Sequence, residues 1–217
     1  MKVNKAAARR DATAKWNDRT PWPCVILSVD PGAAAGASII ASGAGGLNLL
    51  LCEAVDIDTT RVEEIIEQAQ HLANVRGLPL VAVLEDWGAG GPRGLSQWIG
   101  LGEARGPWRR WLRMRTNAKI VLARQGRWRS MVIPETGRTN AAGKWEPFGP
   151  DGWKDIAKTT AVDHFVEAYV PPLDAAESAC MGVFAARSDV VGKVLTKTHL
   201  KRHGLTFEPL EPTIFGK

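Results

Sequence analysis

The chain has 217 residues, a formal net charge of +5 and a pI near 9.3, a length that favours one domain with tails. Hydrophobic residues make up 45% and charged residues 24%, which excludes wholesale disorder and a fibrous repeat. Three widely spaced cysteines, Cys24, Cys52 and Cys180, argue against a disulfide framework and a zinc site. No apolar run approaches the roughly 18 residues of a membrane span. No signal-peptide core is visible at the N-terminus, so a reducing, cytoplasmic compartment is expected.

The positive charge is concentrated in two parts of the sequence. Residues 88–138 carry ten Arg, one Lys and two Glu, and residues 1–23 carry six basic and two acidic residues. Arg forms forked hydrogen bonds to phosphate, and the Trp residues among these arginines suit contact with sugars and bases. The distribution therefore favours a nucleic-acid ligand, although a solubilising surface and packing of some Trp side chains in the core are the plainer alternatives.

The first half of the chain predicts a meander of strands followed by a helix. Residues 1–22 are polar, basic and without apolar period, which suggests a mobile arm. Short apolar runs predict strands over residues 24–30, 37–41 and 47–55, with turns between them. Helical spacing of apolar residues predicts a helix over 60–76, and a second fully apolar strand is expected over 78–84.

The second half is expected to be mainly helical. Helices are predicted from 95 past 102, over 107–115, over 153–170 and over 174–187; strands are predicted over 119–123 and 130–133; and a loop is predicted over 135–152. We expect a basic arm at 1–23, one domain at 24–187 and a basic tail at 188–217. The order of elements predicts an α/β fold of the ribonuclease-H-like class, a mixed sheet flanked by helices.

Four carboxylates stand out by position. Asp30 ends the first buried strand and Glu85 ends the second, while Asp174 and Glu177 share one face at the start of the last predicted helix. Each alone has a plainer role as a turn or cap residue. Asp86 should point to the opposite side of its strand from Glu85. If the two strands are adjacent and the helix crosses them, the four carboxylates converge, and oxygen-only ligands select Mg²⁺ or Mn²⁺.

The sequence resembles RuvC-type Holliday-junction resolvases, in a divergent or phage-type form. The resemblance is carried by residues 29–32 with Gly36, by 83–85, by 96–106 and by 174–179, and it spans about residues 25–187. It implies a homodimeric crossover junction endodeoxyribonuclease that cuts four-way DNA junctions by paired nicks. Asp30, Glu85, Asp174 and Glu177 would hold two Mg²⁺ or Mn²⁺ ions, with Lys158 and Arg129 near the scissile phosphate. One departure is Glu177, where bacterial members usually have Asp.

Further residues are candidates for DNA contact. The arginines expected to hold phosphates are Arg93, Arg105, Arg109, Arg110, Arg113, Arg115 and Arg129. Trp87 and Trp98 lie near the predicted site in the sequence, and either could stack on an unpaired base or belong to the core.

Three other functions compete with junction resolution. A ribonuclease-H-like nuclease acting on flaps or structured RNA would use the same carboxylates. An ATP-binding protein of the sugar-kinase or actin type also places Asp and Gly after a first strand, but it normally needs two such halves and a longer chain. A non-catalytic DNA-binding module would tolerate the loss of Asp30 or Glu85.

Overall fold

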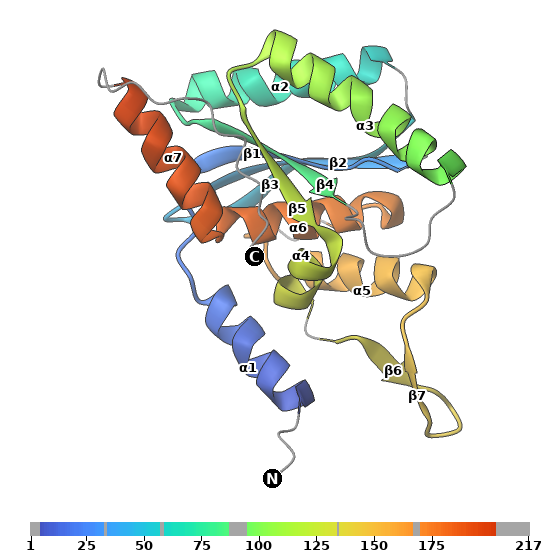
Figure 1. The fold of residues 1–217 in the computed structure, drawn as a ribbon. Coiled ribbons are helices and arrows are strands. Elements are labelled where there is room, and N and C mark those ends of the chain that lie inside the picture. Colours follow the sequence, from blue (N-terminus) through green and yellow to red (C-terminus); the bar gives the residue numbers. More distant parts are fainter. Residues whose placement is uncertain are drawn as a thin grey trace.

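The computed structural model describes residues 5–32, 34–56, 59–86, 95–133, 135–166 and 170–202. Its main sheet has five strands in the order β3-β2-β1-β4-β5 (Figure 1). The strands are β1 (Cys24–Asp30), β2 (Ala34–Gly43), β3 (Gly46–Asp56), β4 (Leu80–Asp86) and β5 (Lys119–Arg124). β1, β2 and β3 pair antiparallel, whereas β4 is parallel to both β1 and β5. The predicted mixed sheet, a meander extended by parallel strands, is confirmed.

Helices cover both faces of this sheet (Figure 1). One face carries α2 (Thr59–Arg76) and α3 (Leu95–Arg115), and the other carries α4 (Gln125–Val132), α5 (Pro150–Val162) and α6 (Ala176–Ala186). A short 3-10 turn, η1 (Leu173–Ala175), precedes α6. The remaining elements are α1 (Lys5–Asn17), α7 (Asp189–Arg202) and a small hairpin of β6 (Gly137–Thr139) and β7 (Trp145–Pro147).

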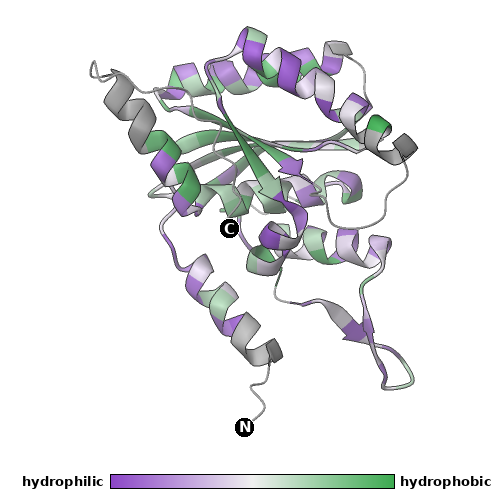
Figure 2. Cartoon of the chain, viewed as in Figure 1, coloured by the Kyte–Doolittle hydropathy of each residue, from purple (hydrophilic) through white to green (hydrophobic). Residues whose placement is uncertain are grey.

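The alternation of side chains along each strand decides which helices they meet. Cys24 and Ile26 of β1 pack in the cluster on the α6 side, while Val25 and Leu27 pack in the cluster on the α2 side. Because both faces of the sheet are buried, its strands are apolar along most of their length, as the colouring in Figure 2 shows. For a polar side chain at the end of such a strand, the alternation along the strand therefore determines which face of the sheet it lies on.

Small residues bring α6 very close to the sheet. A Cβ atom at Gly182 would lie 2.4 Å from the Ile40 Cδ1 atom and 3.3 Å from the Ser28 Cβ atom, so a larger residue would clash there. Every residue of α6 is buried, including Glu177 and Ser178. The close approach brings the start of α6 against the ends of β1 and β2.

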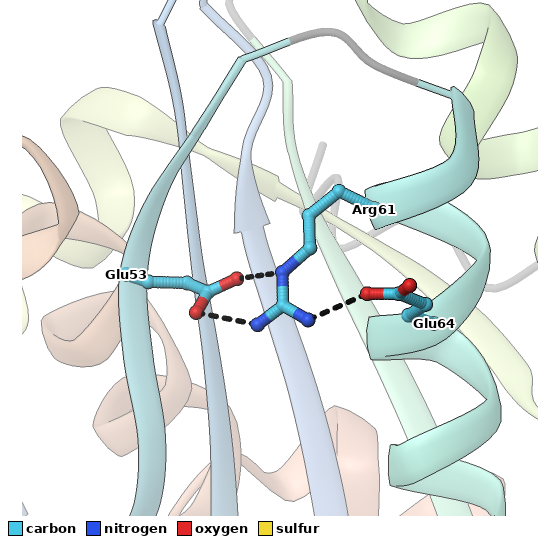
Figure 3. Close-up of polar contacts among 3 residues, drawn as sticks. All are labelled: Glu53, Arg61 and Glu64. Carbon is cyan, nitrogen blue, oxygen red and sulfur yellow. Dashed lines mark hydrogen bonds and ion pairs between the residues drawn. The ribbon is translucent and has the colours of Figure 1, made fainter.

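A charged contact attaches α2 to the edge of the sheet. Arg61 on α2 donates two hydrogen bonds of 2.7 Å to the two carboxylate oxygens of Glu53 on β3 and a third, also 2.7 Å, to Glu64 (Figure 3). The forked geometry fits the planar guanidinium group. Since β3 is an edge strand, this pairing fixes the helix over the last strand of the meander.

Several predicted elements differ from the observed ones. The two helices expected over 95–115 form one helix, α3, because Trp108 and Leu112 remain buried on the sheet beyond Pro107. Residues 130–133, expected as a strand, fall at the end of α4, and the helix expected over 153–170 is α5, which ends at Val162. The expected loop over 135–152 contains the β6–β7 hairpin.

Both ends of the expected domain carry helices. In the basic N-terminal segment, α1 packs through Trp16, whose ring stacks on Phe184 of α6 at 5.9 Å between centroids. After residue 188, α7 buries Val191 and Leu195. One apolar side chain every one or two turns is enough to dock a helix of otherwise polar composition. This explains why the apolar spacing in the sequences of α1 and α7 is weak. No helix in the described part of the chain is both long and apolar enough to cross a membrane.

Candidate active site

Two carboxylates meet at the carboxyl ends of two neighbouring strands inside the sheet. Asp30 is the last residue of β1, and Glu85 is the penultimate residue of the parallel neighbour β4, with Val29 and Leu84 paired one position earlier. Both side chains follow the strand positions that face α6, as alternation requires. The Asp30 and Glu85 carboxyl groups are close enough to share a hydrogen bond when one of them is protonated.

A glycine allows the third acidic segment to approach. Gly36 of β2 is the strand partner of Asp30, and a Cβ atom there would lie 2.8 Å from the Asp174 carbonyl oxygen and 3.0 Å from the Ala175 Cα atom. The backbone of η1 therefore rests directly on the β1–β2 pair. This contact places Asp174 and Glu177 beside the strand ends that carry Asp30 and Glu85.

Glu85 is held in place by two side chains of α4. The indole Nε1 of Trp128 donates a 2.8 Å hydrogen bond to Glu85 Oε1, and Gln125 Nε2 donates a longer one of 3.4 Å to Oε2. Both Glu85 and Trp128 have no exposed surface. A buried carboxylate is costly unless it is paired or hydrogen-bonded, and Trp128 meets part of that requirement.

The other two carboxylates contact basic side chains. The Arg129 guanidinium forms a short ion pair with Glu177, and it also lies over the ring of Trp153, 5.0 Å from its centroid. Lys154 Nζ lies 2.5 Å from Asp174 Oδ1. The site thus combines acidic side chains of the sheet, η1 and α6 with basic side chains of α4 and α5.

Burial and mutual repulsion shift the acids toward their protonated forms. Burial first, and then the negative charge of Glu177, raises the pKa of Asp30 to about 6. Burial and the neighbouring Asp30 raise the pKa of Glu85 well above its ordinary value. Two neighbouring acids that are removed from water favour having one proton or one cation between them.

The donor set suits a hard divalent cation. Within the described ranges, no group of three or more His, Cys, Asp or Glu side chains is already arranged to hold a metal ion. The reason is visible in the contacts: Asp174 and Glu177 are turned toward Lys154 and Arg129, which leaves Asp30 and Glu85 as a pair. That buried pair offers only oxygen ligands and has excess negative charge, which fits Mg²⁺ or Mn²⁺.

The remaining predicted site residues that the structure describes lie on α5, close in sequence to Lys154, or on α3, across the sheet from the carboxylates. Lys158 is on α5, one turn beyond Lys154. Arg105 and Arg115 are on α3, on the opposite face of the sheet, where they pair with Asp86 at 3.6 Å and with Glu63 at 2.5 Å. Arg109, Arg110 and Arg113 line a shallow depression on the same helix. Arg93 and Trp87 lie outside the described residues, as does the side chain of Trp98.

We compared the sequence and the structure with those of known proteins. The sequence matches no family model and no curated protein. Two structures of Thermus thermophilus RuvC are similar to it. The one in complex with Holliday junction substrate has a TM-score of 0.53 at 13% identity, covering 78% of this chain and 96% of RuvC. The other has a TM-score of 0.52 at 15% identity, covering 77% and 96%. This chain has the fold of RuvC.

The likeness to RuvC confirms the ribonuclease-H-like fold predicted from the sequence. A weaker match is the Mn-soaked, inhibitor-bound nuclease domain of human cytomegalovirus terminase, with a TM-score of 0.36 at 12% identity, covering 90% of this chain and 98% of that domain. The RuvC-like sheet of this chain carries Asp30 and Glu85 at the carboxyl ends of its two central parallel strands.

Sequence reasoning missed three side chains that touch the carboxylates: Trp128, Gln125 and Lys154. Trp128 stood out only as part of a basic, aromatic segment, with no sign that its indole faces Glu85. Lys154 and Lys158 are four apart and therefore on one face of a helix, so the sequence offers both equally. Only the packing of α5 against η1 shows that Lys154 is the one beside Asp174.

Proposed function

We propose that this protein is a divalent-metal-dependent endonuclease that cuts DNA at four-way junctions. The observation that carries the proposal is the pairing of the partly buried Asp30 with the fully buried Glu85 at adjacent strand ends, with Glu177 close enough to act electrostatically on both. Such a pair serves no packing purpose, and it is costly to keep in a core without a cation. The RuvC fold supports a nuclease, because one of the similar structures holds a Holliday junction.

The residues divide into metal-holding and phosphate-holding groups. Asp30 and Glu85, joined by Asp174 and Glu177, would hold one or two Mg²⁺ or Mn²⁺ ions. When bound, such ions lower the pKa of a water nucleophile and stabilise the leaving oxygen of a phosphodiester. Trp128 and Gln125 keep the Glu85 carboxylate oriented. Lys154 and Arg129 exchange their present carboxylate partners for non-bridging oxygens of the scissile phosphate.

The junction is the favoured substrate because of symmetry and charge. A homodimer would present two such sites to a four-way junction, which itself has two-fold symmetry. The arginines proposed for phosphate contact are Arg93, Arg105, Arg109, Arg110, Arg113, Arg115 and Arg129, with Lys158 beside the site. Of these, Arg129 already lies among the carboxylates, while those of α3 described above would contact duplex arms farther from the cut.

A cleavage panel tests the proposal. Wild type, Asp30→Asn and Glu85→Gln are incubated with a labelled four-way junction, a matched duplex, a flap and an RNA–DNA hybrid, with Mg²⁺ or Mn²⁺. We expect paired nicks in the junction and a roughly thousandfold slower reaction in both variants, since several kcal/mol of charge stabilisation are lost.

Asp86→Asn is the matched control. Asp86 directly follows Glu85 but faces α3, where it pairs with Arg105 at 3.6 Å, so its loss should leave the cleavage rate within about threefold. Cleavage of the flap or the hybrid in place of the junction would keep the metal site and change the substrate. Tight DNA binding with no cleavage under either metal would contradict the enzyme and favour a binding module.

A further inference from the structure

The β6–β7 hairpin projects beyond α4 and α5, on the side of the sheet away from α2 and α3 (Figure 1). It connects α4, which holds Trp128 and Arg129, to α5, which holds Lys154. At its base, the ring of Phe148 meets Trp153 edge-on at 5.4 Å, and Trp153 lies under the Arg129 guanidinium. A continuous set of packed side chains therefore links the hairpin to Glu177, the partner of Arg129.

The hairpin has a defined turn. Asn140 accepts hydrogen bonds of 3.0 Å from the backbone N–H groups of Ala142 and Lys144, and its amide donates one of 2.9 Å to Glu146. Gly143 has a φ of +74°, a left-handed conformation that suits glycine. These contacts hold the residues at the tip in one arrangement and occupy the only acidic side chain of the hairpin.

The exposed chemistry of the hairpin is aromatic and basic. The Trp145 side chain is 57% exposed, although its ring rests on the backbone of Gly137, where a Cβ atom would lie 2.7 Å from it. Arg138 and Lys144 are exposed as well; Arg138 pairs across the hairpin with Glu146, whereas Trp145 pairs with Thr139. Between the strands, residues 141–143 are the small residues Ala, Ala and Gly. A large aromatic ring that is more than half exposed on a projecting hairpin is typical of a binding surface.

We propose that this hairpin is a DNA-contacting finger in which Trp145 stacks on a base exposed at the branch point, while Arg138 and Lys144 contact the flanking phosphates. The inference rests on the proposed function, since it places the branch next to the carboxylates. DNA is favoured over a protein partner because the hairpin exposes two positive charges against one negative charge, Glu146, and because it joins the two helices that supply Arg129 and Lys154. Stacking requires no particular base, so the finger recognises branched structure rather than sequence.

The test reads base stacking directly. A four-way junction carrying 2-aminopurine at the branch point is titrated with the full chain in the Asp30→Asn background, so that the DNA stays intact. Anisotropy of a second label gives the affinity, and 2-aminopurine fluorescence reports stacking. A linear duplex with 2-aminopurine in the same sequence serves as the unbranched reference.

Four variants separate the contributions of the hairpin. We expect Trp145→Leu to weaken junction binding about tenfold to a hundredfold and to abolish the change in 2-aminopurine fluorescence, with little effect on the duplex. Trp145→Phe should retain both. Arg138→Ala with Lys144→Ala should weaken binding and flatten its salt dependence while leaving stacking intact. The control Arg76→Ala removes an exposed charge at the end of α2, on the other face of the sheet, and should change nothing.

Each contrary result has a distinct meaning. If Trp145→Leu binds the junction and alters 2-aminopurine fluorescence as the parent does, the finger is not a DNA contact. If Trp145→Leu instead converts a sedimenting dimer to a monomer, Trp145 belongs to a subunit interface and the proposal is wrong. If wild type cleaves nothing yet the Trp145-dependent signal persists, the nuclease function fails and the finger stands. A circular dichroism spectrum and unfolding midpoint for each variant exclude misfolding.

Discussion

Trp128 fixes the orientation of the Glu85 carboxylate. Its indole N–H donates to one carboxylate oxygen at 2.8 Å, and neither side chain has any exposed surface. A buried tryptophan usually finds one hydrogen-bond acceptor, and here that acceptor is a proposed metal ligand. Trp128 is therefore a positioning residue: it acts through Glu85 and not on the substrate.

We predict that Trp128→Phe weakens metal binding more than it weakens folding. Losing a hydrogen bond to a charged group costs about 1.5–3 kcal/mol, so the Mg²⁺ concentration for half-maximal cleavage should rise about tenfold or more. A Mg²⁺ titration of the cleavage rate measures this. Trp111→Phe, a matched change on α3 beneath Arg115, should leave the midpoint unchanged. An unaltered Mg²⁺ midpoint in Trp128→Phe would show that the indole contact is only structural.

At the scale of elements, the packing of α5 against α6 includes a histidine that lies just past the end of α5. His164 is partly buried, and its Nδ1 atom lies 3.3 Å from Nη1 of Arg187, which follows α6. Burial first, and then the positive charge of Arg187, lowers the pKa of His164 to about 4. The fold therefore holds this ring in its neutral form.

We predict that this histidine makes the protein less stable in acid. Its ordinary pKa is about 6.5, so between pH 6.5 and 4 the unfolded chain takes up a proton that the folded chain does not. Stability is full above pH 6.5 and falls by about 3 kcal/mol as the pH drops through that window. Urea unfolding at pH 7.5, 6.5, 5.5 and 4.5 measures the loss.

Two histidine variants isolate that contribution from other titrating groups. His164→Gln should flatten the pH dependence of the unfolding free energy over this window. His71→Gln, which changes an exposed histidine on α2, should follow the wild-type curve. Parallel curves for wild type and His164→Gln would contradict the assignment. The raised pKa values of Asp30 and Glu85 act in the opposite direction, which is why the difference between variants is the quantity to compare.

At the scale of the whole molecule, the sheet concentrates negative charge at one edge of an apolar core. Asp30 and Glu85 lie close together there, and Glu177 adds to the repulsion. Arg129 and Lys154 neutralise only the outer carboxylates directly. Without a divalent cation, the folded state therefore carries an electrostatic cost, which the proposed metal site would explain.

We predict that removing one of these carboxylates increases stability while it reduces activity. In EDTA, Asp30→Asn should raise the unfolding temperature by about 3–6 °C, as expected when 1–2 kcal/mol of repulsion is removed from a chain of this size. Mg²⁺ should raise the unfolding temperature of wild type but not that of Asp30→Asn. Asp86→Asn should gain nothing in EDTA, because its carboxylate has a basic partner. A lower unfolding temperature for Asp30→Asn in EDTA would contradict this account.

The pattern of the sequence predicts the sheet and its central acids well. Residues 24–27 and 80–84 are apolar at every position, which is typical of strands buried on both faces, and an acid at the end of such a strand is rare. Period-two alternation then places Glu85 and Asp86 on opposite faces, as the structure shows. These features are local, so they can be read from one segment at a time.

Elements held by few long-range contacts were not predictable in this way. Helix α1 docks through Trp16 and Phe184, which are far apart in the sequence. The β6–β7 hairpin depends on cross-strand pairs in a segment whose composition is typical of a loop. Helix α3 continues past Pro107 because burial of Trp108 and Leu112 outweighs the local signal to stop.

By itself, the sequence determined the mixed sheet, the two strand-end acids and the basic character of the chain, because each depends on residue type and local period. Only the tertiary structure decided which basic residue meets which acid: Lys154 with Asp174, Arg129 with Glu177, and Arg105 with Asp86 on the far face. The physical reason is that ion pairs depend on distances of a few ångströms between elements. Those distances are set by packing, as at Gly36, where the absence of a side chain lets η1 approach the sheet.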